Sequence, residues 1–381
     1  MTPQARAQAA IEILDQVIAA TRDDGPPADS LVTAYFKTRR YAGAKDRRAV
    51  RELVFAAIRH SAERPETGRA ALLPIAGELF DGAPHGPEPV REGEARAEAG
   101  DVPPWLLPEL SCLVQVDGSL VERAPLDLRA KPPREAVAVE FPDAHPTPFS
   151  PWGLRLPPDS KVTDHPAYLG GRVEVQDEGS QLIALASAPA GGERLLDLCA
   201  GAGGKSLALA AAAPGAEIIA CDTNRQRLSR LQPRALRAGA QIAVRLLDVP
   251  REAEGLSDLR GRCDLVLVDA PCSGSGTWRR NPEGRWRLSP ERLERLLALQ
   301  ARVLDLAAPL VRPGGRLVYA VCSLLNREGA GQAEQFLSRH SAYKVEDPGL
   351  TAGRSDGAGK LLTPGHDGTD GFFIARFGLN G

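Results

Sequence analysis

The 381-residue sequence lacks several features that would narrow its function at once. It has no excess of charge, because 47 Lys and Arg stand against 49 Asp and Glu and leave a net charge of -2. A uniformly basic nucleic-acid-binding protein is therefore excluded, although a local basic face on a neutral chain can still bind RNA. The sequence also has no apolar run of about 18 residues, so we expect no membrane span. Its N-terminus leads into an amphipathic stretch rather than the apolar core of a signal peptide.

Cysteine is scarce and shows no metal-binding pattern. No two cysteines are separated by only two residues, so we expect no zinc knuckle and no metal. Free thiols and the absence of a signal peptide favour a reducing, cytoplasmic setting. The hydrophobic fraction of 43% and the charged fraction of 25% are those of a globular protein, and the length allows two or three domains. The cysteines are Cys112, Cys199, Cys221, Cys263, Cys272 and Cys322.

Three regions of distinct composition precede residues 172–381. Residues 1–80 have helical periodicity, with Ile11, Leu14, Val17 and Ile18 on one face. Residues 81–104 are rich in Gly, Pro, Glu and Ala and are interpreted as a linker or exposed loop. Residues 105–171 predict a small α+β module, with short strands at 137–139 and 153–156. A basic cluster in the first region is either a solvated helix face or an RNA contact; it comprises Lys37, Arg39, Arg40, Lys45, Arg47, Arg48 and Arg51.

In residues 172–381, strand-like runs alternate with helical ones. Apolar, β-branched strands separated by helices predict a mainly parallel sheet covered by helices on both faces, which is an α/β fold. The predicted strands are 194–198, 217–220, 243–247, 264–268 and 316–320, and the predicted helices are 206–213, 224–238 and 290–310.

A glycine-rich turn, Cys199-Ala200-Gly201-Ala202-Gly203-Gly204-Lys205, follows the first predicted strand. Ligands of open α/β sheets bind beyond the carboxyl ends of the strands, and glycines let the backbone approach a ligand closely. The Gly-x-Gly-x-x-Gly spacing of a dinucleotide-binding protein is absent, and Cys199 stands where a Walker loop needs its first glycine. A dehydrogenase and a phosphate-loop protein are therefore both disfavoured.

Three acidic residues follow three successive strands: Asp222, Asp248 and Asp269. Asp222 lies about 20 positions beyond the glycine turn, where a carboxylate accepts hydrogen bonds from ribose hydroxyls. Asp248 is placed to meet an adenine amino group. A helix N-cap or a loop residue is the ordinary alternative for each. Three acids at successive strand ends predict a nucleoside cofactor that lacks phosphates.

These motifs resemble those of the Sun/nucleolar-protein family of RNA 5-methylcytosine methyltransferases, whose bacterial branch includes a small-subunit ribosomal RNA enzyme with a NusB-like N-terminal domain. The glycine turn is similar to the family's Asp-x-Cys-Ala-x-Pro-Gly-Gly-Lys-Thr, with Ala202 in place of Pro and Ser206 in place of Thr. Asp269-Ala270-Pro271-Cys272-Ser273-Gly274 matches the fourth-strand motif without departure. Tyr319-Ala320-Val321-Cys322-Ser323 resembles the Thr-Cys-Ser motif, with Val321 in place of Thr.

The resemblance is strong over about 173–377 and implies an architecture and an activity. It implies a Rossmann-like class I methyltransferase domain over 172–381 that binds S-adenosylmethionine, an RRM-like module over 105–171 and a NusB-like RNA-binding domain over 1–80. The implied reaction is methylation of carbon 5 of a cytosine in RNA, with 16S ribosomal RNA favoured. The implied cofactor contacts are Cys199, Ala200, Gly201, Ala202, Gly203, Gly204, Lys205, Asp222, Arg227, Asp248 and Asp269.

The family chemistry needs a reactive cysteine, because carbon 5 of cytosine is a poor nucleophile, and a second group that helps release the product. A thiolate that adds to carbon 6 makes the ring enamine-like and activates carbon 5. The resemblance implies that Cys322 is this nucleophile and that Cys272 helps release the product. It also implies that Asp269 binds the cytosine edge and that Lys205 holds that carboxylate or the ring. A small buried apolar role is the ordinary alternative for a free cysteine, but both cysteines lie just past predicted strand ends.

Two short segments interleave aromatic and basic residues, Trp278-Arg279-Arg280 and Arg285-Trp286-Arg287. They are predicted to stack bases and bind phosphates, the alternative being Arg packed on Trp. Two other functions stay open: a transfer RNA cytosine-5 methyltransferase, and a non-catalytic RNA-binding factor of ribosome assembly. The chain lacks the Asn/Asp-Pro-Pro-aromatic motif of nitrogen and protein methyltransferases. We expect a monomer whose partner is RNA and which does not bind membranes.

Overall fold

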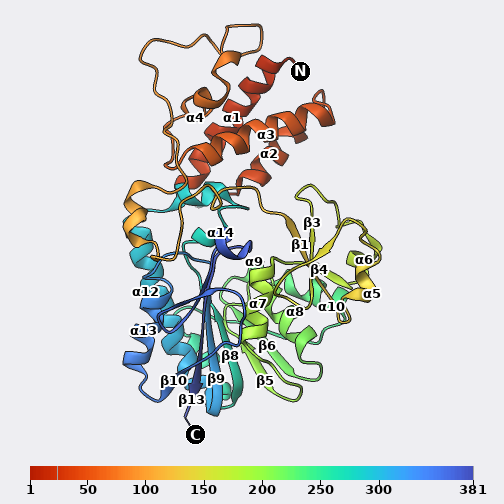
Figure 1. Ribbon diagram of the computed structural model, residues 1–381, viewed down its shortest axis with the longest axis vertical. Helices are drawn as coiled ribbons and strands as arrows, with labels where there is room; N and C mark the ends of the chain where they lie inside the picture. The colour runs from red at the N-terminus through yellow and green to blue at the C-terminus, as the bar shows by residue number, and fades with distance from the viewer. Residues whose placement is uncertain (24, 381) are drawn as a thin grey trace. The chain divides into compact units, whose positions relative to one another are not determined.

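The computed structural model describes residues 1–23 and 25–380 (Figure 1). The chain forms two compact units. The helical unit comprises Met1–Leu110, Gln115–Glu122 and Thr277–Pro290, and the sheet unit comprises the remainder. The short 3-10 helices are η1 (Gly77–Leu79), η2 (Pro104–Glu109), η3 (Ser257–Leu259), η4 (Ser275–Thr277), η5 (Pro282–Arg287) and η6 (Ala308–Leu310).

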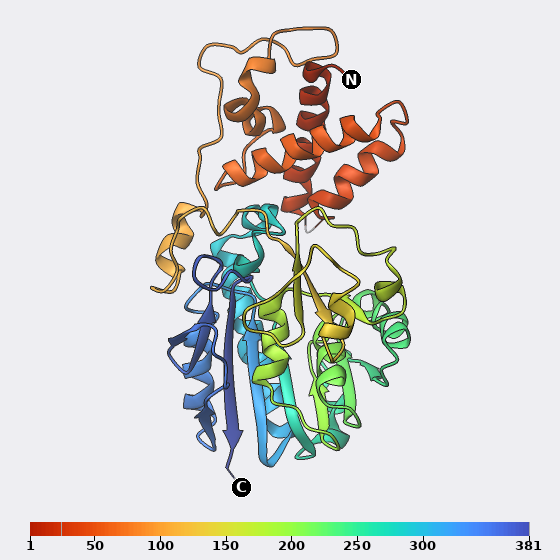
Figure 2. The same ribbon diagram turned by 45° about the vertical axis from the view of Figure 1, so that its right-hand side comes forward.

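The helical unit is built on four helices (Figure 2): α1 (Pro3–Arg22), α2 (Ala28–Lys37), α3 (Ala44–His60) and α4 (Gly68–Ala76). The hydroxyls of Thr2 and Thr67 cap α1 and α4 by accepting from backbone amides of the first turn. The predicted apolar face of α1 is buried, with Leu14 fully inaccessible. The helical character predicted for this region is confirmed.

The segment Thr277–Pro290 completes the core of the helical unit, although it follows the fourth strand of the predicted sheet. The Trp286 ring is 2% exposed within that core. The Arg285 guanidinium donates to the carbonyl oxygens of Ile58, at 2.5 Å, and Asp101, at 2.7 Å. The carbonyls of the last turn of a helix have no partner within the helix, so this arginine satisfies the end of α3.

This burial corrects one prediction about RNA contact. The side chains of Trp278 and Trp286 are 1% and 2% exposed, so neither ring is available to stack on a base. The prediction that these tryptophans contact RNA is wrong, because their large apolar area is buried by packing. In the basic cluster, Lys37, Arg40, Lys45 and Arg48 are exposed. RNA binding by that cluster stays a prediction.

The small module within the sheet unit is a four-stranded antiparallel sheet of order β2-β3-β1-β4. The predicted strand at 153–156 is confirmed. The predicted strand at 137–139 is wrong, because Val137 and Ala138 lie in a short helix whose amides donate to the Arg134 carbonyl. So short an apolar run does not distinguish strand from helix. The elements of the small module are β1 (Leu126–Ala130), α5 (Glu135–Ala138), β2 (His145–Pro146), β3 (Gly153–Leu156), α6 (Pro166–Leu169) and β4 (Val173–Val175).

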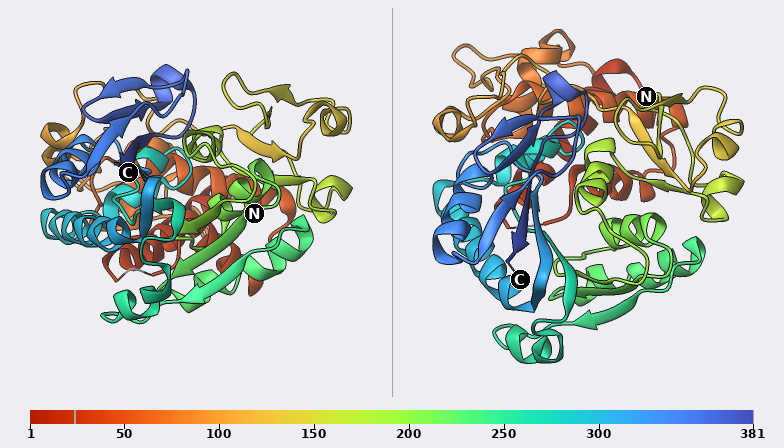
Figure 3. Two further views of the ribbon diagram at one scale, coloured as in Figure 1. Left: turned by 90° about the horizontal axis from the view of Figure 1, so that it is seen from below. Right: turned by 60° about the horizontal axis from the view of Figure 1, so that its bottom comes forward.

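The main sheet has the predicted parallel strands side by side, in the order β7-β6-β5-β8-β9, with β7 at one edge of the sheet (Figure 3). Antiparallel strands extend it beyond β9: β13 pairs with β9, and β12 and β10 pair with β13. The predicted Rossmann-like α/β fold is confirmed. The strands are β5 (Arg194–Asp197), β6 (Glu217–Asp222), β7 (Ala243–Leu246), β8 (Cys263–Asp269), β9 (Val311–Val321), β10 (Tyr343–Glu346), β11 (Arg354–Asp356), β12 (Gly359–Leu362) and β13 (Phe372–Leu379).

Helices cover both faces of this sheet. Leu265 and Leu267 of β8 pack into one cluster with residues of α7, α8 and α10. Alternate residues of a strand point to opposite faces, and on the other face Phe336 of α13 stacks against Phe377 of β13, with ring centroids 5.0 Å apart. The helices are α7 (Glu178–Ala186), α8 (Gly204–Ala212), α9 (Arg225–Leu228), α10 (Leu231–Ala238), α11 (Glu252–Gly255), α12 (Pro290–Ala307), α13 (Ala330–Arg339) and α14 (Pro364–Asp367).

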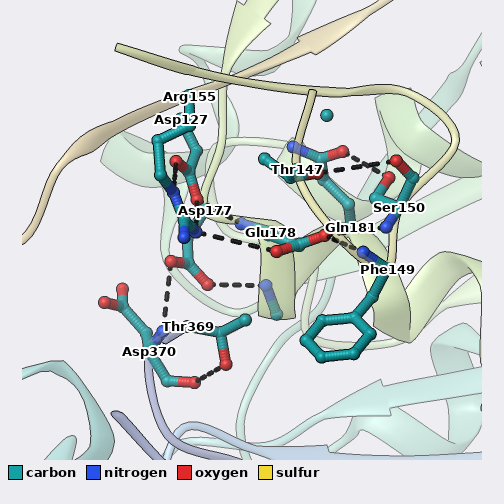
Figure 4. Close-up of polar contacts among 12 residues, drawn as sticks. Asp127, Thr147, Phe149, Ser150, Arg155, Asp177, Glu178, Gln181, Thr369 and Asp370 are labelled. Atoms are coloured by element: carbon teal, nitrogen blue, oxygen red, sulfur yellow. Dashed lines mark hydrogen bonds and ion pairs between the residues drawn. The ribbon is translucent and has the colours of Figure 1, made fainter. Parts of the chain in front are cut away.

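A buried ion network ties the small module to α7 (Figure 4). The Asp127 carboxylate accepts two hydrogen bonds from Arg155, at 2.7 and 2.8 Å, and one from the Glu178 amide at 3.1 Å. The Glu178 carboxylate in turn accepts from the amides of Phe149 and Ser150, both at 2.7 Å. The Asp127 and Glu178 side chains are fully buried. The module is therefore held to the main sheet through paired charges.

Candidate active site

The glycine turn connects β5 to α8 and requires glycine at one position. Gly201 has a φ of +54° and Gly203 a φ of +82°, both in the left-handed region. A Cβ atom on Gly203 would lie 2.5 Å from Cγ of Leu231, a distance that side chains do not tolerate. A Cβ on Gly204 would instead meet open space. The turn therefore packs tightly against α10 at Gly203.

A buried carboxyl group lies directly beneath this turn. Asp197, the last residue of β5, is inaccessible to solvent, and its Oδ2 accepts from the Ser206 hydroxyl at 2.6 Å. Burial raises the pKa of Asp197 to about 7, although the hydrogen bond from Ser206 lowers it. The charges of Asp269 and Asp222 also raise this pKa. Ser206, which replaces the family's Thr, keeps the hydroxyl that makes this bond. Asp197 opens the recognised motif, but the sequence did not indicate that it is buried.

Asp222 at the end of β6 holds the turn in place. Its Oδ2 accepts from the Gly201 amide and its Oδ1 from the Asn224 amide, both at 2.7 Å. Each carboxylate oxygen has a second acceptor position, so hydrogen bonds from ribose hydroxyls are compatible with this geometry. The structure thus brings Asp222 and the turn together, and contact of Asp222 with a ribose stays a prediction.

Two predicted cofactor residues lie farther out on the surface. The Asp248 side chain is 73% exposed, and its Oδ2 lies 3.7 Å from Nη2 of Arg251. Arg227 is exposed on α9, and its amide donates to Asn224. Contacts of Asp248 and Arg227 with a cofactor stay predictions.

Lys205 and Asp269 form an ion pair across the carboxyl edge of the sheet. Lys205 is the second residue of α8, Asp269 is the last of β8, and Nζ lies 2.7 Å from Oδ2. Burial lowers the pKa of Lys205, but the Asp269 carboxylate outweighs it and raises the pKa above its usual value. The amine also lies over the Phe372 ring, 5.6 Å from its centroid. The Asp269 carboxylate thus favours the charged form of Lys205 at a half-buried site.

The two predicted catalytic cysteines meet at the same edge. Cys272 follows β8, Cys322 follows β9, and these adjacent strands are parallel, so their carboxyl ends lie together. The Sγ atoms are 3.3 Å apart. The hydrogen bond with Cys322, together with burial, raises the pKa of Cys272 well above its usual value. Cys272 is therefore a thiol at neutral pH that can donate its proton to the sulfur of Cys322.

Cys199 is distinct from these two thiols. Burial, and then the neighbouring charges of Asp197, Asp269 and Asp222, raises its pKa well above the usual value. The Cys199 thiol is therefore un-ionised at neutral pH and suits a wall of the turn rather than a nucleophile.

One buried acid beside the cysteines was not predicted. Glu328, in the loop after β9, is fully inaccessible and accepts hydrogen bonds from Ser273 and Ser323. Those serines were recognised only as parts of motifs. A single Glu in a loop has no periodic pattern, so nothing in the sequence indicated that Glu328 is buried.

No group of three or more His, Cys, Asp or Glu side chains that could hold a metal occurs in residues 1–23 and 25–380. Over the same stretches, no helix has the length and apolar character needed to cross a membrane.

Comparisons with known proteins agree with this geometry. Residues 184–378 match the family described as 16S rRNA methyltransferase RsmB/F. A Salmonella arizonae relative named ribosomal RNA small subunit methyltransferase B is 37% identical over 232 residues, which are 61% of this chain and 53% of that protein. A Salmonella paratyphi B relative of the same name gives the same values. The chain thus spans about half the length of the curated relatives that it matches.

Solved structures share the fold. The crystal structure of PH0851 has a TM-score of 0.73 and 21% identity, with 97% of this chain and 98% of that chain covered. NSun6 from Pyrococcus horikoshii, crystallised with SFG, has a TM-score of 0.62 and 18% identity, with 68% of this chain and 92% of that chain covered. At these identities the likeness concerns the fold alone.

Proposed function

Because the chain belongs to the 16S rRNA methyltransferase RsmB/F family, we propose that it methylates carbon 5 of a cytosine in 16S ribosomal RNA. One observation carries the proposal: the Cys272 and Cys322 sulfurs lie 3.3 Å apart at the strand edge that also holds the Lys205–Asp269 pair. Nitrogen methylation needs no thiol nucleophile, whereas covalent activation of carbon 5 needs a thiol that adds to carbon 6, and a second thiol beside it can assist its release.

The proposed cofactor is S-adenosylmethionine, and the residues present fit it. The turn at Gly201 and Gly203 permits close approach of a ligand, and Asp222 can accept from ribose hydroxyls. The acidic edge also suits a positively charged sulfonium. When bound, S-adenosylmethionine supplies an electrophilic methyl group. The related NSun6 structure with SFG supports a ligand site in this fold.

The proposed chemistry divides the work between the cysteines. The Cys322 thiolate forms a bond to carbon 6 of cytosine, and the electron pair displaced in the ring makes carbon 5 nucleophilic. Carbon 5 would then take the methyl group that S-adenosylmethionine supplies, and the methyl–sulfur bond would break to leave a neutral thioether. A base then removes the carbon 5 proton, the carbon 6–sulfur bond breaks, and Cys322 leaves as a thiolate. The Cys272 thiol, which its raised pKa keeps protonated, stabilises that leaving thiolate by hydrogen bonding.

The Lys205–Asp269 ion pair acts on the cytosine ring rather than on the cysteine sulfur. Asp269 accepts from the amino edge of the cytosine and favours the protonated ring during thiolate addition. Lys205 orients the Asp269 carboxylate, since its Nζ contacts Oδ2. A target base must leave its stack to reach these groups.

We further propose domain roles. Residues 1–80 form a NusB-like RNA-binding domain, 81–104 a linker, 105–171 an RRM-like module and 172–381 the methyltransferase domain. The exposed Lys37, Arg40, Lys45 and Arg48 supply phosphate contacts, since exposed cations on one helical unit give RNA affinity without sequence preference.

The test is methyl transfer to total RNA with a labelled cofactor, comparing wild type with Cys322→Ala and Cys272→Ala. Cys112→Ala, which removes an exposed thiol, is the control. We expect 5-methylcytosine in 16S ribosomal RNA from wild type and the control, none from Cys322→Ala, and a covalent protein–RNA adduct with Cys272→Ala. Label found in transfer RNA would identify transfer RNA, rather than 16S ribosomal RNA, as the substrate. Normal methylation by Cys322→Ala would refute the adduct, and no transfer by any protein would favour a binding factor.

A further inference from the structure

The loops that carry the two cysteines converge on one buried carboxylate. Glu328 Oε2 accepts from the hydroxyls of Ser273 and Ser323, each at 2.5 Å, and Oε1 accepts from the Ser273 amide at 2.9 Å. Ser273 directly follows Cys272, and Ser323 directly follows Cys322. The same side chain thus bonds to the neighbour of each cysteine.

A second layer of contacts supports this carboxylate. Gln300 of α12, itself inaccessible, donates through Nε2 to Glu328 Oε1 at 2.9 Å and to the Pro271 carbonyl at 3.0 Å. The Gly276 amide donates to the Cys322 carbonyl at 3.0 Å. The loop after β8 is thereby fastened to the loop after β9 on both sides of the thiols.

The charge of Glu328 is also significant. Its two oxygens contact two N–H donors and two hydroxyls, a set of polar contacts that an apolar side chain cannot make. Its charge contributes to the raised pKa of Cys272, after the hydrogen bond with Cys322, burial and the charge of Cys322. Burying a charge is costly, and an apolar side chain would fill the same space at lower cost. Stability alone therefore does not account for a carboxylate here.

We propose that Glu328 is a positioning residue that sets the spacing of the Cys272 and Cys322 thiols by holding Ser273 and Ser323. Its effect on methylation rests on the proposed function, but the spacing itself does not. In the isosteric Glu328→Gln, the amide oxygen still accepts from the Ser273 amide and Gln300, and the amide nitrogen donates to both hydroxyls. Glu328→Ala removes all four bonds.

The spacing is measured directly with phenylarsine oxide, whose arsenic bridges two thiols that lie close together. The rate of bridging between Cys272 and Cys322 is mapped by mass spectrometry in the full-length protein, with Cys272→Ser as background. We expect bridging about 10-fold slower in Glu328→Ala, because small displacements of reacting groups are costly, and within about threefold of wild type in Glu328→Gln. Glu252→Ala is the matched control, because it removes another buried carboxylate of the sheet unit, paired with Arg302, and should bridge normally.

Methylation is measured on the same proteins. We expect Glu328→Ala to lower kcat more than it changes KM for RNA, with Glu328→Gln restoring most of the rate. Bridging at the wild-type rate in folded Glu328→Ala overturns the proposal. If that variant does not fold, Ser273→Ala combined with Ser323→Ala takes its place: slower bridging supports the proposal and unchanged bridging overturns it. If bridging is slowed in Glu328→Ala but the wild-type protein methylates no RNA, the spacing role is supported and the proposed function is refuted.

Discussion

The amine of Lys205 lies 2.7 Å from the Asp269 carboxylate and so joins the first turn of α8 to the end of β8. This contact links the cofactor turn to the loop that carries Cys272. Neither residue has another partner among its described ion pairs, so each orients the other at a half-buried site.

Lys205→Met should therefore affect the chemical step. We expect kcat for methylation to fall about 100-fold or more, because an unpaired Asp269 is held less firmly where charge develops on the ring. Single-turnover methyl transfer at saturating cofactor is the measurement. Lys344→Met, which removes an exposed amine from β10, should retain the wild-type rate. An unchanged single-turnover rate in Lys205→Met would contradict the role assigned to the pair.

Gly203→Ala and Gly204→Ala form a matched pair. Gly203→Ala forces a left-handed residue with a Cβ, which costs about 1–2 kcal/mol, and it also clashes with Leu231. We expect a lower unfolding free energy and weaker binding of S-adenosylmethionine, measured by urea unfolding and calorimetry. In Gly204→Ala, at the first residue of α8, the new Cβ meets open space, so the unfolding free energy should equal that of wild type. Equal stability of the two variants would show that the turn is not constrained at Gly203.

Stability should depend on pH through Asp197. Its pKa is raised from 3.8 to about 7, so the folded protein binds a proton that the unfolded chain releases. The unfolding free energy should therefore fall as pH rises between about 4 and 7, by a few kcal/mol, and level off above that window. In Asp197→Asn, which can still accept from Ser206, this slope should be absent. Asp258→Asn, whose carboxyl pKa is lowered mainly by Arg245, should keep the slope between pH 4 and 7. An unchanged slope in Asp197→Asn would show that another group causes the pH dependence of stability.

Trp286→Ala should destabilise the helical unit, although residue 286 is distant in sequence from the four helices of that unit. Removing a fully buried indole costs about 3–5 kcal/mol. The hydrogen bond from Nε1 to the Ser61 carbonyl is lost as well. Chemical unfolding of the full-length chain, followed by the circular dichroism of its helices, measures this loss. Arg225→Ala at an exposed position of α9 is the control, and RNA affinity lost without any loss of stability would instead favour direct RNA contact.

Arg155→Met should loosen the small module. The substitution leaves Asp127 and Glu178 as two buried carboxylates without their cation, at a cost of about 3–5 kcal/mol. Hydrogen exchange of amides in β1 and β3 should rise relative to those in β5 and β8. Arg123→Met, whose ion pair with Asp159 is exposed, should change little. Uniform exchange rates in Arg155→Met would show that the module is held by its apolar core alone.

Local pattern and motif spacing determined much of this protein. The five parallel strands follow from runs of apolar, β-branched residues, since a strand buried on both faces admits little else. Parallel strands end at one edge, so Cys272 and Cys322, each placed after a strand, had to lie at that edge. The pairing of β8 with β9, which the structure decided, brings them together. Asp222 and Asp269 follow from the same rule.

Only the tertiary structure decided the features that depend on contacts between distant segments. Arg285 and Trp286 complete the helical unit because they satisfy the end of α3 and fill its core, which no local periodicity encodes. Glu328 is buried because Ser273 and Ser323 converge on it from two loops. The role of a side chain can be predicted from the sequence where its own strand positions it. It cannot be predicted where partners from distant parts of the chain bury it.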